Sequence, residues 1–356
     1  MLILSARVYF MWVEIILLVR TVGRWLLEST AFHMGLWRDS RLGFKRRLKE
    51  LVGTKIKRAF IGVLKGFIKK SFPFWQSLGF HITPNHFHQP IPDTRKLKDD
   101  LWLKKSNLVG IDMNEEGQIT LLSQFSSQFK HEYERFPGHK TPVPYQYYVN
   151  NGAFVSVDGE ILYCIIRHFK PSKIFEVGSG YSTYLSAEAL LRNEEETGNL
   201  GKLIVFDPYP NDTLMAGFPG LSKLVISKIE DTDLTRFDEL EENDILFIDS
   251  THVLKIGGDV QFLYLEVLPR LRKGVMVHIH DIFLPSEYPK KWVLKDYRFW
   301  TEQYLLQAFL AFNYAFEVLW AGSYMHLRYP DKLKQAFDSY DPSTTQPGSF
   351  WIRKKI

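Results

Sequence analysis

The sequence predicts an α/β fold, with helices on both faces of a parallel sheet and a helical extension at the N-terminus. Three observations predict this fold. Short apolar runs alternate with helical patterns in the C-terminal part of the chain, and a glycine turn joins one of these runs to a helix. The composition, with 45% hydrophobic and 24% charged residues in 356, is that of a folded globular protein. These proportions exclude wholesale disorder and collagen-like repeats.

Residues 1–71 are expected to form a basic helical extension. Residues 8–19 are apolar except for Glu14. The run is shorter than the roughly 20 residues that a bilayer-spanning helix needs, so an amphipathic or partly buried helix is predicted. Between residues 41 and 70, eleven Lys and Arg residues accompany one acid, Glu50. Apolar residues recur in this segment at spacings of three and four, which is typical of an amphipathic helix.

The basic segment 41–70 has two interpretations. It could lie on an anionic membrane surface, with its apolar side chains in the interface, or it could pack on its own domain with a solvated basic face. Nucleic acid is not expected as a partner, because no aromatic stacking platform or recognition motif accompanies the charge. The only cysteine is Cys164, which excludes an intrachain disulfide. We therefore expect a cytoplasmic location, at the inner face of the membrane if the segment binds lipid.

Residues 72–141 are expected to form a connecting or lid region before a catalytic domain at 142–356. Residues 72–92 are dense in Pro, His and aromatic residues, which indicates an ordered loop. The three histidines of this loop are interpreted as packing residues, because a metal site also needs matching geometry. They are His81, His86 and His88.

The alternation of elements begins after residue 142. Helices are predicted at 159–169, 183–192 and 301–312. Apolar runs predict seven strands, at 173–177, 203–206, 224–226, 245–248, 275–279, 316–320 and 348–353. Strands that alternate with helices imply parallel pairing, and ligands of such sheets bind beyond the carboxyl ends of the strands.

The most specific motif is Glu-Val-Gly-Ser-Gly-Tyr-Ser-Thr at 176–183, where the first predicted strand turns into a helix. Glycines allow a ligand to approach the backbone closely. Thr183 occupies the position at which a dinucleotide-binding turn has its third glycine, and Glu176 is an acid that such a turn does not need. Both features argue against NAD as the cofactor.

With these residues the chain resembles the class I S-adenosylmethionine-dependent methyltransferases, within them a bacterial group with an E-V-G-S-G-Y-S-T turn and a D-x-x-H segment. The resemblance extends from about residue 145 to the C-terminus, and weakly over 80–93. It implies a Rossmann-like seven-stranded sheet that ends in an antiparallel pair, and S-adenosylmethionine as the cofactor. The residues that it implies for cofactor binding are Glu176, Gly178, Ser179, Gly180, Thr183, Asp207, Asp231 and Asp249.

The resemblance also implies roles for these residues. Gly178 and Gly180 would pass beneath the methionine moiety, and Glu176 would anchor the loop or the amino group of the ligand. Asp207, which follows the second strand, would accept hydrogen bonds from the ribose hydroxyls. It lies 29 positions after Gly178, farther than usual, and a polar insert at 193–201 accounts for the excess. Asp231 is preferred to Glu230 as the contact of the adenine amino group.

Polar residues follow the fourth and fifth predicted strands, where the methyl acceptor is expected. The fourth strand leads into Asp249 and His252, and the fifth into His280 and Asp281. His252 or His280 could act as the general base for a hydroxyl acceptor, because the pKa of histidine lies near neutrality. By similarity to metal-dependent O-methyltransferases, Asp249, His280 and Asp281 could instead bind a divalent cation. His278 is interpreted as a core residue.

The sequence therefore predicts an S-adenosylmethionine-dependent methyltransferase. Its acceptor is expected to be a hydroxyl on a small molecule, a saccharide or a lipid-linked compound. The alternative is a non-catalytic protein of the same fold that acts as a scaffold at the membrane surface, since a fold does not determine a function.

Overall fold

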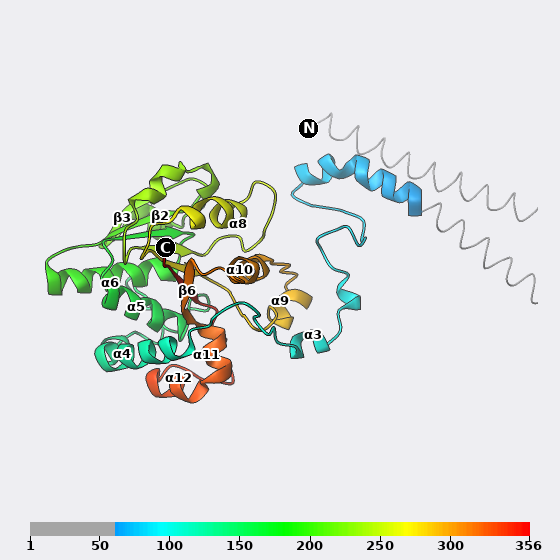
Figure 1. Cartoon of the computed structure of the whole chain (residues 1–356). Helices are drawn as coiled ribbons and strands as arrows, with labels where there is room; N and C mark the ends of the chain where they lie inside the picture. The colour runs from blue at the N-terminus through cyan, green and yellow to red at the C-terminus, as the bar shows by residue number, and fades with distance from the viewer. Residues whose placement is uncertain (1–60) are drawn as a thin grey trace, which may run out of the picture. The chain divides into compact units, whose positions relative to one another are not determined.

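The computed structural model describes residues 61–356, and the chain divides into two compact units, residues 1–89 and 90–356 (Figure 1). In the first unit residues 61–77 are helical, and His81 stacks on Phe72 with ring centroids 5.7 Å apart. The helix predicted at 8–19 and the part of the basic segment before residue 61 lie outside the described residues. Over the range 61–356, no helix has the length and apolar character needed to span a membrane.

The second unit contains a seven-stranded sheet in the order β3-β2-β1-β4-β5-β7-β6. The strands are β1 (Lys173–Val177), β2 (Lys202–Phe206), β3 (Leu221–Val225), β4 (Ile245–Ile248), β5 (Met276–Ile279), β6 (Phe316–Ala321) and β7 (Phe350–Lys354). The first five pair in parallel, whereas β7 lies antiparallel to both β5 and β6. The predicted α/β fold and all seven predicted strands are confirmed.

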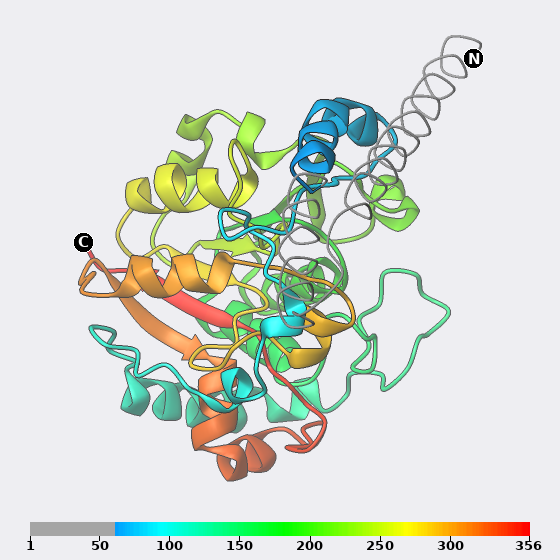
Figure 2. The ribbon, with the colours of Figure 1, turned by 90° about the vertical axis from the view of Figure 1, so that its right-hand side faces the viewer.

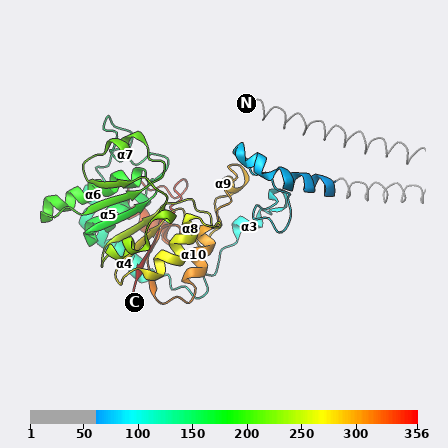
Figure 3. The ribbon, with the colours of Figure 1, turned by 90° about the horizontal axis from the view of Figure 1, so that it is seen from above.

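Alternate residues of each strand point to opposite faces of the sheet, and each face is buried under helices. On one face Ile174 and Phe247 pack with α4 (Glu115–Tyr133), α5 (Asp158–Phe169) and α6 (Tyr181–Thr197). On the other, Phe175 and Ile248 pack with α8 (Asp259–Phe262), the π-helical turn η4 (Leu263–Val267) and α10 (Glu302–Leu310). Figure 3 shows the sheet between these two groups of helices.

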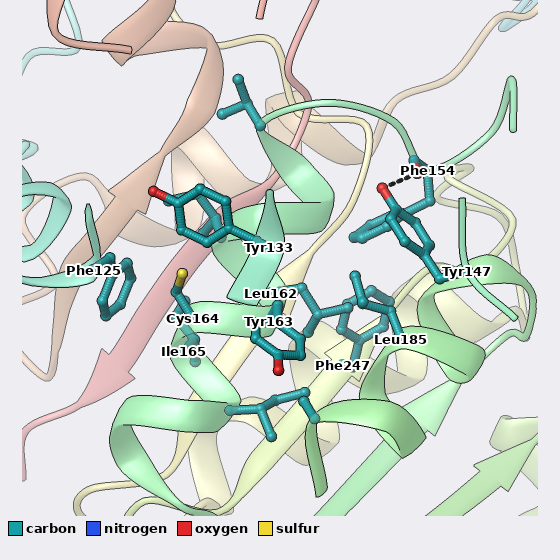
Figure 4. Packing of buried hydrophobic residues seen from close by; sticks show 14 of the residues in the cluster. Phe125, Tyr133, Tyr147, Phe154, Leu162, Tyr163, Cys164, Ile165, Leu185 and Phe247 are labelled. Carbon is teal, nitrogen blue, oxygen red and sulfur yellow. Dashed lines mark hydrogen bonds between the residues drawn. The ribbon is translucent and has the colours of Figure 1, made fainter. Parts of the chain in front are cut away.

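Helix α5 lies at the centre of the first layer. Ten of its twelve residues are buried, and its apolar side chains contact α4, α6 and the sheet (Figure 4). Tyr147, in the segment that leads into α5, donates a hydrogen bond from its hydroxyl to the carbonyl of Phe154 at 3.0 Å. This bond satisfies the one polar atom of a fully buried ring, as burial requires.

Shorter elements connect the strands and the main helices. In chain order they are η1 (Thr94–Lys96), α3 (Asp100–Leu103), α7 (Asp212–Ala216), η2 (Ile229–Asp231), η3 (Leu234–Glu239), η5 (Leu268–Arg270), α9 (Lys290–Leu294), α11 (Gly322–Arg328) and α12 (Pro330–Ala336).

Two local expectations differ from the structure. Helix α6 continues through Thr197 and ends at Gly198, whose φ of +73° is left-handed, so about half of the expected polar insert is helical. The C-terminal antiparallel pair is present, but α11 and α12 lie between its strands along the chain. Figure 2 shows β7 in red beside β6 in orange.

Candidate functional site

The glycine turn after β1 packs against the carboxyl end of β4. Gly178 has a φ of +83°, and a Cβ added there would lie 2.0 Å from the carbonyl oxygen of Asp249. A glycine is therefore required at 178 both by the backbone conformation and by the neighbouring strand. A Cβ at Gly180 would meet no atom within 4 Å. Of the two glycines, Gly180 is the one that borders open space in which a ligand can lie.

Glu176 ties β1 to the first turn of α6. Its Oε1 accepts hydrogen bonds from the hydroxyls of Ser182 at 2.6 Å and Thr183 at 3.0 Å, and Thr183 Oγ1 accepts one from the backbone N–H of Gly180. Burial raises the pKa of Glu176 to about 8, against the two hydroxyl hydrogen bonds, which lower it. Oε2 is buried without a hydrogen-bond partner in the described part of the chain. Glu176 thus fixes the loop through one carboxylate oxygen, and its other oxygen makes no hydrogen bond within the described residues.

Asp207 lies beside the same turn. Its Oδ2 accepts a hydrogen bond from the hydroxyl of Ser179, and its Oδ1 accepts one from the backbone N–H of Tyr209 at 2.7 Å. The acid after β2 and the loop after β1 are therefore in direct contact. Asp231 ends η2, which follows β3, and it is exposed. None of the contacts found within residues 61–356 joins its side chain to the glycine turn.

His252 is surrounded by carboxylates. Its Nδ1 lies 2.8 Å from Glu302 Oε2, and its Nε2 lies 3.2 Å from Asp249 Oδ1 and 3.6 Å from Asp281 Oδ2. Burial lowers the pKa of His252, but the hydrogen bonds and charges of Asp249 and Glu302 outweigh burial and raise it to about 10. At neutral pH and with only protein groups present, this ring is an imidazolium.

The backbone around His252 is held in an uncommon conformation. His252 and Asp281 are left-handed, with φ values of +59° and +56°. The carbonyl of His252 accepts hydrogen bonds from the N–H groups of Thr301 at 2.9 Å and Glu302 at 3.1 Å, which begin α10. Strained residues of this kind cluster at functional sites, where the surrounding structure imposes them. The start of α10 thus fixes both the ring and the backbone of His252.

One group among the described residues has the arrangement needed for a metal ion: ligand atoms of Asp249, His252 and Asp281 lie within 4.8 Å of one another. The side chains of Asp249 and Asp281 are 35% and 19% exposed, so the group can be reached from solvent. A metal-binding imidazole commonly bonds a carboxylate through its second nitrogen, as His252 bonds Glu302. His280, which similarity to metal-dependent enzymes had indicated for this set, is not in the group.

His278 lies in β5, and His280 follows that strand directly. His280 Nε2 is 3.7 Å from Asp281 Oδ1, and its Nδ1 is buried without a hydrogen-bond partner in the range 61–356. Burial lowers the pKa of His280, but the charges of Asp281, Asp249 and Asp158 raise it overall. His278 is fully buried and stacks on Phe247 with centroids 3.9 Å apart, and burial holds its pKa well below the ordinary value. His278 therefore has the expected place of a core residue.

Two residues of the site were not found from the sequence. Glu302 is fully buried against His252 although the two lie 50 positions apart. Trp300 lies over the His252 ring with centroids 4.3 Å apart. Trp300 belongs to an aromatic run at 288–304, and nothing in that run indicates which ring reaches the histidine. No local pattern marks Glu302.

Comparisons with known proteins identify related chains. A family model described as a methyltransferase domain matches residues 175–282. An uncharacterized protein of Archaeoglobus fulgidus is 30% identical over 176 residues, which are 47% of this chain and 77% of the relative. Two solved structures are similar: a putative methyltransferase from Thermobifida fusca YX and an apo TDP-rhamnose 3'-O-methyltransferase of calicheamicin biosynthesis. The first is 15% identical, with 67% of this chain and 94% of that chain covered and a TM-score of 0.35. The second is 14% identical, with coverages of 70% and 99% and a TM-score of 0.33.

The family model begins within β1 and ends one residue after Asp281. It therefore includes the glycine turn, Asp207 and Asp249, and with them most of the site described above. A sheet of this order, with its antiparallel β7 between β5 and β6, surrounds them. Residues 175–282 therefore form a methyltransferase domain, as the resemblance to the class I S-adenosylmethionine-dependent methyltransferases implies, and the chain is a methyltransferase.

Proposed function

We propose that this methyltransferase transfers the methyl group to a hydroxyl oxygen, and that Asp249, His252 and Asp281 form the acceptor-activating centre. The observation that carries the proposal is the position of the cluster. The backbone N–H of Asp249 donates to the carbonyl of Val177 at 2.9 Å, directly before the glycine turn. The cluster is therefore adjacent to the loop that we assign to S-adenosylmethionine. A hydroxyl bound there lies next to the donor, as an in-line displacement requires.

The cofactor is assigned to the loop and the acids that follow β1, β2 and β3. Gly180 borders the open space that the methionine moiety would occupy, and Asp207 would accept hydrogen bonds from the ribose hydroxyls. Glu176, which precedes the turn by two residues, has a buried Oε2 that makes no hydrogen bond within residues 61–356. Because Asp231 is exposed after β3, it remains our assignment for the adenine contact.

The residues of the cluster favour catalysis with a bound divalent cation over catalysis by a histidine base alone. His252 is protonated at neutral pH while only protein groups surround it, because its pKa is about 10, so it does not accept the proton of the acceptor. As a metal ligand the ring would have to release its Nε2 proton, which would make cation binding stronger at higher pH. Asp249, His252 and Asp281 offer one nitrogen and two oxygens, a set that suits manganese, iron or zinc better than magnesium. When bound, such a cation supplies Lewis-acid stabilisation of the negative charge on the acceptor oxygen.

The protein groups of the cluster have separate parts in the reaction. The bond between sulfur and the methyl carbon breaks as the bond between oxygen and that carbon forms, and the hydroxyl proton leaves to a carboxylate of the cluster and then to water. Asp249 and Asp281 are the half-buried carboxylates that can receive it. Glu302 is a positioning residue, because it bonds the far nitrogen of the His252 ring. We expect the acceptor to be a small molecule, a saccharide or a lipid-linked compound.

The cofactor assignment is tested by calorimetric titration with S-adenosylhomocysteine. We expect the wild-type protein and Asp212→Ala, which removes an exposed acid five residues further on, to bind equally. Asp207→Ala should bind about tenfold or more weakly, because a charge-assisted hydrogen bond is lost. Equal binding by Asp207→Ala would contradict the assignment. No binding by the wild type would leave the scaffold alternative.

The cation is tested separately by titrating chelator-treated, dialysed protein with Mn²⁺ and with Mg²⁺. We expect Mn²⁺ to bind at one site, and Asp249→Asn and Asp281→Asn to abolish that binding. Asp238→Asn, a change at an exposed aspartate in η3, is the matched control and should leave binding unchanged. Binding of Mn²⁺ that survives in Asp249→Asn would exclude the cluster as the site. The carboxylates of Asp249 and Asp281 would then be tested as proton acceptors without a cation.

A further inference from the structure

The acceptor side of the cluster is walled by two tryptophans. Trp300 lies over His252 at 4.3 Å, and Trp292 meets Trp300 at 5.2 Å with the ring planes 71° apart. Both rings are half-buried, and they belong to the segment that runs from α9 to the start of α10. The two rings therefore form a corner directly beside the acceptor-activating centre.

Arg298 lies in this corner. Its guanidinium carbon is 4.7 Å from the ring centre of Trp292 and 5.0 Å from that of Trp300. The backbone N–H of Arg298 donates to the carbonyl of Trp292 at 2.9 Å, which holds the segment in place. Contact with two ring faces orients a guanidinium without using the N–H groups on its edge.

The N–H groups of Arg298 are available to a ligand. Within residues 61–356 the guanidinium makes no hydrogen bond and no ion pair, and the residue is exposed. Lys290, on the same segment, is by contrast paired with Asp99 at 2.8 Å. An arginine that two aromatic rings hold in position, with its donors unused, is suited to bind a carboxylate or a phosphate through two parallel hydrogen bonds.

Two groups of residues with opposite charge meet at the Trp300 ring. One is His252, 4.3 Å from the ring centre, together with the carboxylates of Asp249, Asp281 and Glu302 around it. The other is the segment 290–298, which carries four basic residues and one acid and includes Arg298, 5.0 Å from the ring centre. A ligand that extends from His252 past Trp300 to Arg298 would place a hydroxyl at one end and an anionic group at the other.

We propose that Arg298, Trp292 and Trp300 form an anion subsite of the acceptor site, and that the acceptor is a hydroxyl compound that carries a phosphate or a carboxylate. The assignment of the acceptor rests on the proposed function, because that function places the hydroxyl at His252. The binding of the anion by Arg298 does not depend on it. Arg298 is a binding residue and takes no part in the chemical step.

The test is an anion titration of the protein saturated with S-adenosylhomocysteine, followed by tryptophan fluorescence at constant ionic strength. Inorganic phosphate and benzoate are the two probes, since they separate the two anionic groups. The protein is first treated with a chelator and dialysed, so that no cation at Asp249 can bind the probe. We expect a saturable change in fluorescence with at least one probe.

Variants identify the residue. Arg298→Gln should weaken binding of the probe about tenfold, because a charge-assisted bidentate contact is lost. Lys295→Gln removes the same charge from the same segment without touching the tryptophan corner, and it should bind as the wild type does. Arg298→Lys should bind with intermediate affinity, since it keeps the charge and loses the planar fork. Thermal unfolding of each variant checks that the fold is unchanged.

Each outcome has one meaning. Tighter binding of phosphate supports a phosphorylated acceptor, and tighter binding of benzoate supports a carboxylate acceptor. Unchanged binding by Arg298→Gln, an equal loss in Lys295→Gln, or no saturation would overturn the subsite. Because binding of S-adenosylhomocysteine is measured in the same samples, its absence reports failure of the proposed function, whereas its presence without anion binding reports failure of the subsite alone.

A methyl-transfer assay adds a second readout. Hydroxyl compounds are offered in pairs that differ only in a phosphate or a carboxylate. For an anionic acceptor we expect Arg298→Gln to raise KM about tenfold with kcat nearly unchanged, as loss of uniform binding predicts. Equal use of the neutral and the anionic member of every pair would contradict the proposal.

Discussion

Alanine substitutions at Gly178 and Gly180 should have different effects, because the first glycine is needed for folding and the second borders the space assigned to the ligand. Gly178→Ala forces a residue with a Cβ to a φ of +83° and brings that Cβ to 2.0 Å from the carbonyl oxygen of Asp249. Left-handed backbone costs an L-residue about 1–2 kcal/mol, and overpacking adds about 1–3 kcal/mol. We therefore expect the free energy of unfolding to fall by about 2–5 kcal/mol, a large share of the stability of an ordinary domain.

Gly180→Ala is the matched change two residues further on. Its Cβ would meet nothing within 4 Å, and its φ of 169° is extended backbone, so we expect a change in stability below about 0.5 kcal/mol. The same Cβ would occupy the space assigned to the ligand, and it should weaken binding of S-adenosylhomocysteine at least about tenfold. Urea unfolding followed by circular dichroism, together with calorimetry, measures both quantities. Equal midpoints for Gly178→Ala and the wild type, or loss of stability without loss of binding in Gly180→Ala, would refute the reasoning.

Three other predictions concern acid stability, a buried ion pair and the N-terminal segment. Burial holds the pKa of His278 well below its ordinary value of 6.5, so below about pH 6.5 the unfolded chain binds a proton that the folded protein does not. The free energy of unfolding should therefore fall as the pH decreases, by up to roughly 1.4 kcal/mol per pH unit. His278→Phe, which keeps the stacked ring, should reduce this slope in urea unfolding between about pH 5 and about pH 7, and an unchanged slope would exclude His278 as its source. Arg167, whose side chain is 2% exposed, lies 2.9 Å from Glu132. Arg167→Leu removes the cation from that acid, which keeps its hydrogen bond from the Tyr163 hydroxyl, and should cost about 3 kcal/mol. The exposed pair Arg192 and Glu195 should cost less than about 1 kcal/mol when broken by Arg192→Leu, and thermal unfolding compares the two variants. If the basic segment lies on a membrane, cosedimentation with anionic vesicles should fall steeply with salt and disappear on deletion of residues 1–70, and unchanged cosedimentation after the deletion would reject that interpretation.

The local chemistry of the chain was sufficient to predict most of the fold. Residues 173–177 and 245–248 are the strands β1 and β4 at the same bounds, because a short, continuous apolar run between turn residues has few alternatives to a buried strand. Asp207, Asp249 and Asp281 follow strands closely in the sequence. Because the carboxyl ends of parallel strands meet at one edge of a sheet, the sequence alone is enough to place these acids at that edge.

Other features depended on the path of the chain. The position of β7 could be predicted to within a few residues. The two helices that separate it from β6 could not, because the antiparallel pairing of two strands does not determine the length or structure of the segment that connects them. The polar residues 193–197 were expected to be an insert and are helical in α6, where Asn193 donates a hydrogen bond to the carbonyl of Ile166 in α5 and Glu196 accepts one from Arg167.

The sequence by itself determined that this protein has a parallel α/β sheet, a glycine turn after its first strand, and acids and histidines at the ends of its fourth and fifth strands. Only the tertiary structure decided which of those histidines joins the carboxylates. His252 reaches Asp249 and Asp281 because its backbone is left-handed and α10 holds it through Glu302, whereas His280, which is equally buried, lies outside this group of ligand atoms. Contacts across 50 positions, such as those of Glu302 with His252, arise from the folding of distant segments onto one another, and no local pattern in the sequence encodes them.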